Sequence, residues 1–303
     1  MPAPVQLVDS HQHVCWHGRD ARGLVADMDA HGIGYAWLLT WLIGPRDEQP
    51  EYHEFLNPAL HGPADTNPGI TLGEVVAAAE RYPGRFVPGY CPHPEWRNAP
   101  QLLEAAHRMH GVRVCGEWKF RMLIDDPRCL EVFRTAGRLQ MPVVIHLDVP
   151  YLANEAGARV FQSKWYGGTI DNLSRALAAC PETVFVGHAP GFWREISGDA
   201  DTQSAVYSDG PIAPGGRLHE LFARHANLRA DLSASSALRA LRRDPRHAVD
   251  FLARYADRLL FGRDIYGTLL HEFLASLPLP DDVVQAIYWR NAERLVAPPQ
   301  RIS

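Results

Sequence analysis

Two histidines separated by one residue, His11 and His13, end the first apolar run of the chain. Successive side chains of a β-strand point to opposite faces, so a strand over residues 5–13 directs both imidazoles, with Asp9 in step, to one side. Two imidazoles on one face are a ready pair of metal ligands. Because two ligands do not make a site, the rest of the chain has to supply the others.

Three further candidates each follow directly after an apolar run, where a titratable residue is otherwise out of place: His146, His188 and Asp264. Three imidazoles, from His11, His13 and His146, with the Asp264 carboxylate form a donor set suited to Zn²⁺, with Mn²⁺ as the alternative. A metal ion in such a site can lower the pKa of its bound water to about 7, so that the water can act as a nucleophile. His188 is then available as a general acid or base.

The elements that must position these residues alternate between strand-like and helix-like segments, which is typical of a parallel α/β fold. Eight such cycles in 303 residues favour a (β/α)8 TIM barrel in a single domain, residues 1–303. Active-site residues of such barrels lie at the C-terminal ends of the strands, where all five candidates fall. We expect strands near residues 5–13, 35–40, 85–90, 111–120, 142–147, 184–188, 228–233 and 259–264, and helices near 21–31, 71–82, 98–109, 127–139, 169–179, 236–256 and 281–294.

Three segments exceed the usual length of a connection, 43–70, 150–168 and 190–216. We expect them to be long loops over the site rather than linkers between domains. Several of them, and the end of the first strand, carry side chains that suit a flat, carboxylate-bearing substrate: Trp16, Arg46, Trp165 and Trp193. Packing within the loops is the alternative explanation for the tryptophans.

The composition excludes several classes of function. A net charge of -5 and a pI near 6.3 argue against nucleic acid as a partner, because proteins that bind it usually carry a surplus of basic residues. The first residues lack the features of a signal peptide, and no apolar run approaches the length that spans a bilayer, so we expect a cytoplasmic protein without membrane contact. Five cysteines without a C-x-x-C pair argue against a disulfide framework or a cysteine-based zinc site.

Taken in order, the motifs at the strand ends resemble those of the amidohydrolase superfamily, in particular the amidohydrolase-related branch that includes aminocarboxymuconate-semialdehyde decarboxylase. They are Asp9-Ser10-His11-Gln12-His13, Val144-Ile145-His146, Phe185-Val186-Gly187-His188 and Leu260-Phe261-Gly262-Arg263-Asp264, followed by a last helix over 287–295. Each motif is weak alone, and the set covers nearly the whole chain.

The resemblance implies a metal-dependent barrel enzyme with one divalent ion. His11, His13 and His146 would bind the metal, Asp264 would bind it and handle the proton of the activated water, and His188 would assist the water or the substrate. Glu117 and Lys119 share a face of the fourth strand. Binuclear members of the superfamily carry a bridging carboxylated lysine on this strand, but we interpret Lys119 as a buried partner of Glu117 or, with Glu117, as a substrate contact. The resemblance also favours a homodimer.

The leading functional hypothesis is a metal-dependent hydrolase that cleaves a C–O or C–N bond of a small molecule, such as a lactone or an amide. The closest alternative is a non-oxidative decarboxylase of an aromatic or muconate-type acid, which uses the same metal ligands. A third possibility is a catalytically inactive barrel with a binding role. A fourth is an unrelated barrel with structural histidines, which the convergence of the ligands on one point would exclude.

Overall fold

The computed structural model describes residues 7–44, 46–47, 52, 54–62, 66–163 and 165–300. The predicted start of the first strand, residues 5 and 6, lies outside these ranges. Within them, eight parallel strands follow one another around a ring: β1 (Leu7–Gln12), β2 (Ile33–Leu38), β5 (Phe86–Pro88), β6 (Cys115–Trp118), β7 (Val143–His146), β10 (Phe185–His188), β11 (Leu228–Asp231) and β12 (Leu259–Leu260).

The ring consists of two parallel sheets, β1-β2-β5 and β6-β7-β10-β11-β12. They join on one side through a parallel bridge between Gly89 and Val114. On the other side, the backbone N–H of Ser10 donates to the carbonyl of Phe261 at 2.9 Å. The predicted (β/α)8 barrel is therefore confirmed.

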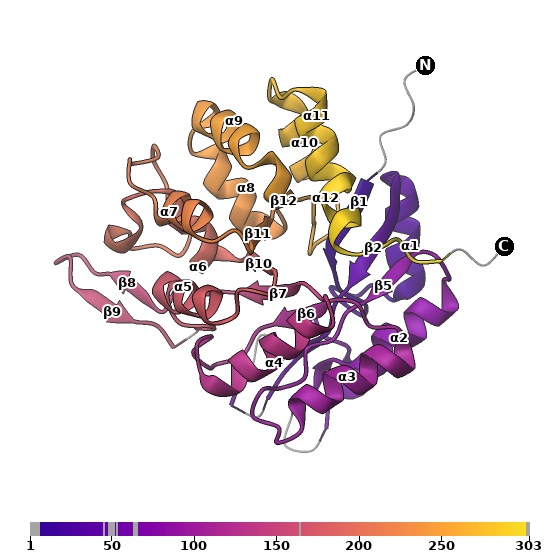
Figure 1. The fold of residues 1–303 in the computed structure, drawn as a ribbon. Coiled ribbons are helices and arrows are strands. Elements are labelled where there is room, and N and C mark those ends of the chain that lie inside the picture. Colours follow the sequence, from indigo (N-terminus) through magenta and orange to yellow (C-terminus); the bar gives the residue numbers. More distant parts are fainter. Residues whose placement is uncertain are drawn as a thin grey trace.

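Helices surround the ring of strands (Figure 1). Several begin with a recognisable cap: Asp126 and Asp244 each accept a backbone N–H in front of a proline at the first helical position, and Thr71 forms a capping box with Glu74. The helices are α1 (Ala21–Ala30), α2 (Leu72–Arg81), α3 (Ala99–His110), α4 (Pro127–Arg138), α5 (Ile170–Ala179), α6 (Pro190–Trp193), α7 (Arg217–Arg224), α8 (Ala234–Arg242), α9 (Pro245–Arg254), α10 (Leu269–Ser276), α11 (Asp281–Gln285) and α12 (Asn291–Leu295), the last two joined by a π-helical segment, Ala286–Arg290.

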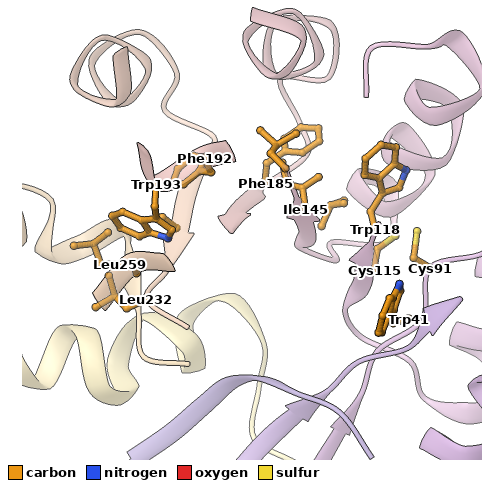
Figure 2. Close-up of a cluster of buried hydrophobic side chains, with 14 of the residues drawn as sticks. Trp41, Cys91, Cys115, Trp118, Ile145, Phe185, Phe192, Trp193, Leu232 and Leu259 are labelled. Carbon is orange, nitrogen blue, oxygen red and sulfur yellow. The ribbon is translucent and has the colours of Figure 1, made fainter. Parts of the chain in front are cut away.

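Alternate residues of the strands build two separate apolar layers. Val144, Val186 and Leu260 belong to a cluster inside the barrel, whereas their neighbours along the chain, such as Ile145 and Phe185, belong to the larger cluster between strands and helices. Figure 2 shows part of this outer layer. With a period of two, the residues two positions after the inner valines also face the barrel interior. This periodicity positions His146 and His188 at the mouth.

Some elements were not expected from the sequence. The predicted loop 150–168 contains an antiparallel hairpin, β8 (Tyr151–Ala153) and β9 (Arg159–Phe161), which extends away from the barrel in Figure 1. A second short antiparallel pair, β3 (Trp41–Leu42) and β4 (Gly69–Ile70), joins the two ends of the predicted loop 43–70. Helix α10 was also missed. No helix in the described part of the chain is long and apolar enough to cross a membrane.

Candidate metal centre

His11 and His13 are both buried at the mouth of the barrel, and each has its Nδ1 atom fixed. His13 Nδ1 lies 2.9 Å from the carbonyl oxygen of Leu39, and His11 Nδ1 lies 2.9 Å from Asp231 Oδ2. A carbonyl oxygen can only accept, so His13 carries a proton on Nδ1 and leaves the Nε2 lone pair free. Among the described residues, the buried Nε2 of His11 has no hydrogen-bond partner, which suits a metal ligand.

Asp231, at the end of β11, holds a second imidazole in the same way. Its Oδ1 atom lies 3.0 Å from Nδ1 of His188 and accepts a 2.5 Å hydrogen bond from the Ser233 hydroxyl. One fully buried carboxylate therefore directs Nε2 of His11 and of His188 towards the barrel mouth. Carboxylates that fix metal-binding imidazoles in this manner set both the tautomer and the ring orientation.

Two carboxylates face these imidazoles, Glu117 from β6 and Asp264 after β12. His13 Nε2 lies 3.5 Å from Glu117 Oε2 and 3.5 Å from Asp264 Oδ1, and His11 Nε2 lies 4.0 Å from Glu117 Oε1 and 3.8 Å from Asp264 Oδ1. Metal–ligand bonds of about 2.0–2.2 Å place tetrahedral neighbours roughly 3.3–3.6 Å apart. The donor atoms thus have nearly the separations that a divalent metal requires, and they fit such an ion.

The backbone around Asp264 is held in an uncommon conformation. Its φ of 60° lies in the left-handed region, which costs a non-glycine residue of the order of 1–3 kcal/mol unless its surroundings enforce it. The Asp264 N–H donates to the carbonyl of His11 at 2.8 Å, and the indole N–H of Trp16 donates to the Asp264 carbonyl at 2.7 Å. These contacts tie the carboxylate directly to the strand that carries the histidines.

The electrostatics of the cluster favour charged carboxylates beside imidazoles. Burial opposes the charge on Glu117, but His146 and His13 hold the pKa of its carboxyl well below the usual range. Burial also lowers the pKa of His11, and the carboxylates of Asp231 and Asp264 outweigh it, raising that pKa to about 10. This surplus of buried negative charge is what a divalent cation neutralises.

His146 approaches Glu117 from β7, with Nδ1 2.7 Å from Glu117 Oε1. His188 Nε2 lies 3.8 Å from the same oxygen. Glu117 is therefore shared by two groups of potential ligands, one with His11 and His13 and one with His146 and His188. The structure thus brings together all five residues predicted as metal ligands or proton carriers, and it adds Glu117 to them.

Comparisons with known proteins were made by sequence and by structure. Neither the scan against protein-family models nor the search of curated proteins gave a match. Solved structures do match over almost the whole chain. One is 5-carboxyvanillate decarboxylase from Sphingomonas paucimobilis, with a TM-score of 0.61, 16% identity, and 96% of this chain and 98% of the other covered.

Two further matches are hydrolase-like proteins. One is a zinc-bound amidohydrolase from Burkholderia multivorans, with a TM-score of 0.59, 16% identity, and coverage of 97% and 100%. The other is a putative 2-pyrone-4,6-dicarboxylic acid hydrolase from Pseudomonas putida, with a TM-score of 0.57, 14% identity, and coverage of 97% and 98%. The chain has the fold of these amidohydrolase-type barrels. The resemblance seen in the sequence is thereby confirmed at the level of the fold.

Lys119 does not pair with Glu117, so this part of the prediction is wrong. In the described structure the Lys119 ammonium makes no ion pair and lies 3.8 Å from the ring centroid of Trp41, with Tyr166 at 5.3 Å. Lys119 directly follows Trp118, the last residue of β6. Lys119 instead lines a cavity of about 400 Å³ beside His146, together with Asp148, Gln162, Ser163 and Tyr207.

The other predicted substrate contacts lie in different places. Trp193 is fully buried in the outer apolar layer, and its indole N–H donates to the backbone carbonyl of Asp231, so it supports the site from behind (Figure 2). Trp16 is also buried, and its indole N–H supports Asp264 by donating to the Asp264 backbone carbonyl. Arg46 is exposed and pairs with Glu95 at a separate cavity, and Trp165 is half-buried beside Phe161 of the β8–β9 hairpin.

Asp231 is the main residue that sequence reasoning missed. It ends an apolar strand, as His146 and His188 do, and this signal could have singled it out. The sequence offered no comparable signal for Ser233 or for the Leu39 carbonyl, because both act through contacts between separate strands. Position 187, just before His188, requires a glycine. A Cβ at this position would lie 2.2 Å from the Phe192 ring, which packs against the strand that ends in His188.

Proposed function

We propose that the chain is a metal-dependent hydrolase of the amidohydrolase superfamily that cleaves a C–O or C–N bond of a small anionic molecule. The observation that carries this proposal is the convergence of His11 Nε2 and His13 Nε2 with the carboxylates of Glu117 and Asp264, while both Nδ1 atoms are fixed from behind. A satisfied structural cluster would not leave the buried Nε2 of His11 without a partner.

His11, His13, Glu117 and Asp264 would hold one divalent ion, Zn²⁺ or alternatively Mn²⁺, with His146 completing the set. Such an ion supplies a water of lowered pKa and polarises a substrate carbonyl. A second ion, if it binds, would be held by Glu117, His146 and His188. The choice of Glu117 as a ligand revises its predicted role as a substrate contact.

The remaining steps fall to the side chains around the ligands. Asp264 is 16% exposed at its side chain, so one carboxylate oxygen can accept the proton of an attacking water and pass it to the leaving group. His188 Nε2, 3.7 Å from Asp264 Oδ2, orients that water or the substrate oxygen. Lys119, whose ammonium has no carboxylate partner in the described structure, holds the negative group of the substrate in the 400 Å³ cavity.

A decarboxylase acting on an aromatic or muconate-type acid is the second candidate. Two observations favour it: the likeness in fold to 5-carboxyvanillate decarboxylase, and a lone ammonium, Lys119, enclosed by aromatic rings next to His146. Here Lys119 would hold a phenolate or a second carboxylate, and Asp264 would deliver the proton that replaces CO2. The same ligands serve both reactions, so the products decide between them.

The test begins with metal analysis of the purified chain and of a His11→Asn, His13→Asn double variant. We expect about one Zn²⁺ or Mn²⁺ per wild-type chain and none in the variant. Metal-loaded protein is then screened against lactones, amides and aromatic carboxylic acids, with CO2 release and water incorporation measured together. Incorporation of ¹⁸O from labelled water into the organic product supports the hydrolase, whereas release of CO2 with no ¹⁸O in the organic product supports the decarboxylase. If the wild-type chain binds no divalent metal, both the hydrolase and the decarboxylase are refuted. The remaining hypothesis is then the catalytically inactive barrel with a binding role.

The expected homodimer is part of the proposal and is checked separately by sedimentation. A monomer at micromolar concentration would contradict it without affecting the metal site.

A further inference from the structure

A second cavity, of about 420 Å³, lies on the side of the barrel at which the strands end. Its walls come from the segments that follow β2, β5 and β6, and none of the candidate metal ligands lines it. The volume lies within the range of small-molecule sites, about 300–1,000 Å³. The apolar part of its lining includes Leu42, Leu72, Tyr90, Trp96 and Met122.

Two carboxylates in this cavity already have partners. Glu95 is paired with both Arg46 and Arg128, which hold the pKa of its carboxyl below its usual value. Asp47 is buried, and its Oδ1 accepts the backbone N–H of Arg121 at 3.0 Å. The other carboxylate oxygen of Asp47, Oδ2, lies 3.6 Å from Nε2 of His93, so both carboxylates have partners other than the Arg121 guanidinium.

The Arg121 guanidinium is the cation of this cavity that has no carboxylate partner among the described residues. Within the described structure its guanidinium makes no ion pair, and Nε and Nη2 are buried without a hydrogen-bond partner. The ring of Tyr166, 6.0 Å from the guanidinium carbon, is its closest aromatic contact and is too distant to replace an anion. A partly enclosed cation without a partner is costly, and an anion at Nη1, the nitrogen that is not enclosed, would relieve that cost.

The remaining feature is Trp96, which is 46% exposed although it is large and apolar. Together with Leu72 and Met122 it offers a flat apolar wall at the cavity. We propose that this cavity binds a small monocarboxylic acid, whose carboxylate meets Arg121 and whose ring or chain packs against Trp96 and Met122. This site is separate from the metal centre, and it does not depend on which reaction the metal centre performs.

Benzoate is the probe, titrated into the metal-loaded full-length protein by calorimetry and followed by tryptophan fluorescence. We expect saturable binding with a Kd of about 1 mM or tighter. Benzamide, which has the same shape without the charge, should bind at least about tenfold more weakly. Arg121→Met should weaken benzoate binding by a similar factor, and Leu72→Trp, which fills the cavity, should abolish it. Arg108→Met, an exposed arginine on α3, is the matched control and should leave it unchanged.

Benzoate can also bind a metal ion, so the His11→Asn, His13→Asn double variant, which is expected to bind no metal, separates the two sites. Retention of benzoate affinity in this double variant together with its loss in Arg121→Met supports the proposal. An unchanged affinity in Arg121→Met overturns it, and loss in the double variant then places the probe at the metal centre. The absence of saturable binding to the wild type also overturns it. Circular dichroism and thermal unfolding of each variant exclude misfolding as the cause of a loss.

Discussion

Asp231 holds two imidazoles with one carboxylate, so Asp231→Asn provides a sharp test of how the centre is organised. The native carboxylate accepts from Nδ1 of His11 at 2.9 Å and from Nδ1 of His188 at 3.0 Å. An amide has one oxygen and one NH2 group, so it can accept from only one of the two rings. The other ring must turn a lone pair on Nδ1 towards the amide, which moves its proton to Nε2, the atom that faces the metal.

The size of the effect follows from this geometry. Loss of a partner that orients a metal ligand typically costs about 10–100-fold in metal affinity. Because the substitution also forces the wrong tautomer on one of the two rings, we expect the upper end, about 100-fold. In the metal-free protein, replacing this fully buried charged acceptor by a neutral amide, which can accept from only one of the two imidazoles, should lower the free energy of unfolding by about 1–3 kcal/mol.

The assay is competition for Zn²⁺ against a chromogenic chelator, with thermal unfolding measured in EDTA in parallel. Asp209→Asn, an exposed aspartate in a loop, is the matched control and should change neither quantity. Ser233→Ala, which removes one hydrogen bond to the same carboxylate, should give a smaller loss of affinity in the same direction. The reasoning is refuted if Asp231→Asn folds and binds Zn²⁺ with wild-type affinity.

Three other predictions follow from the site and its surroundings. Glu117→Gln should weaken metal binding by at least about tenfold, because it removes the carboxylate shared by both ligand groups, whereas the exposed Glu155→Gln should not; equal metal content in the two variants would contradict this role. Lys119→Met should raise KM for an anionic substrate by about tenfold or more with unchanged metal content, and an unaltered KM would remove Lys119 from the substrate site. Burial lowers the pKa of both His219 and His247, whose Nε2 atoms lie 3.2 Å apart, so below pH about 6.5 the unfolded chain binds more protons than the folded chain. The free energy of unfolding should therefore fall as the pH drops below that value, and urea midpoints that do not fall would contradict this.

Much of the fold could be predicted because its signals are local. Apolar runs of β-strand length alternate with capped helical segments, and the ring of eight strands follows from their number and order. The elements that were missed have weaker local signals. The β8–β9 hairpin, for example, has exposed Tyr151 and Phe161 and lacks the buried alternation of a core strand.

The candidate site was predictable in its imidazoles and Asp264 and less so in its other members. His146 and His188 each stand at the C-terminal end of an apolar strand, and this pattern can be read from the sequence alone. Glu117 and Lys119 appeared equivalent because they lie two residues apart in one strand-like run. The strand ends between them at Trp118, so one side chain faces the imidazoles and the other contacts Trp41.

The sequence by itself singled out the four candidate imidazoles and Asp264, and the face of the strand on which most of them lie, because period-two alternation is a property of neighbouring residues. Only the tertiary structure decided how those side chains are used. Asp231 and His11 are 220 residues apart and meet because the strands close into a ring. That closure fixes the His11 tautomer and directs its Nε2 lone pair at the carboxylates, and the fold places the Lys119 ammonium over Trp41 at the edge of a cavity beside His146.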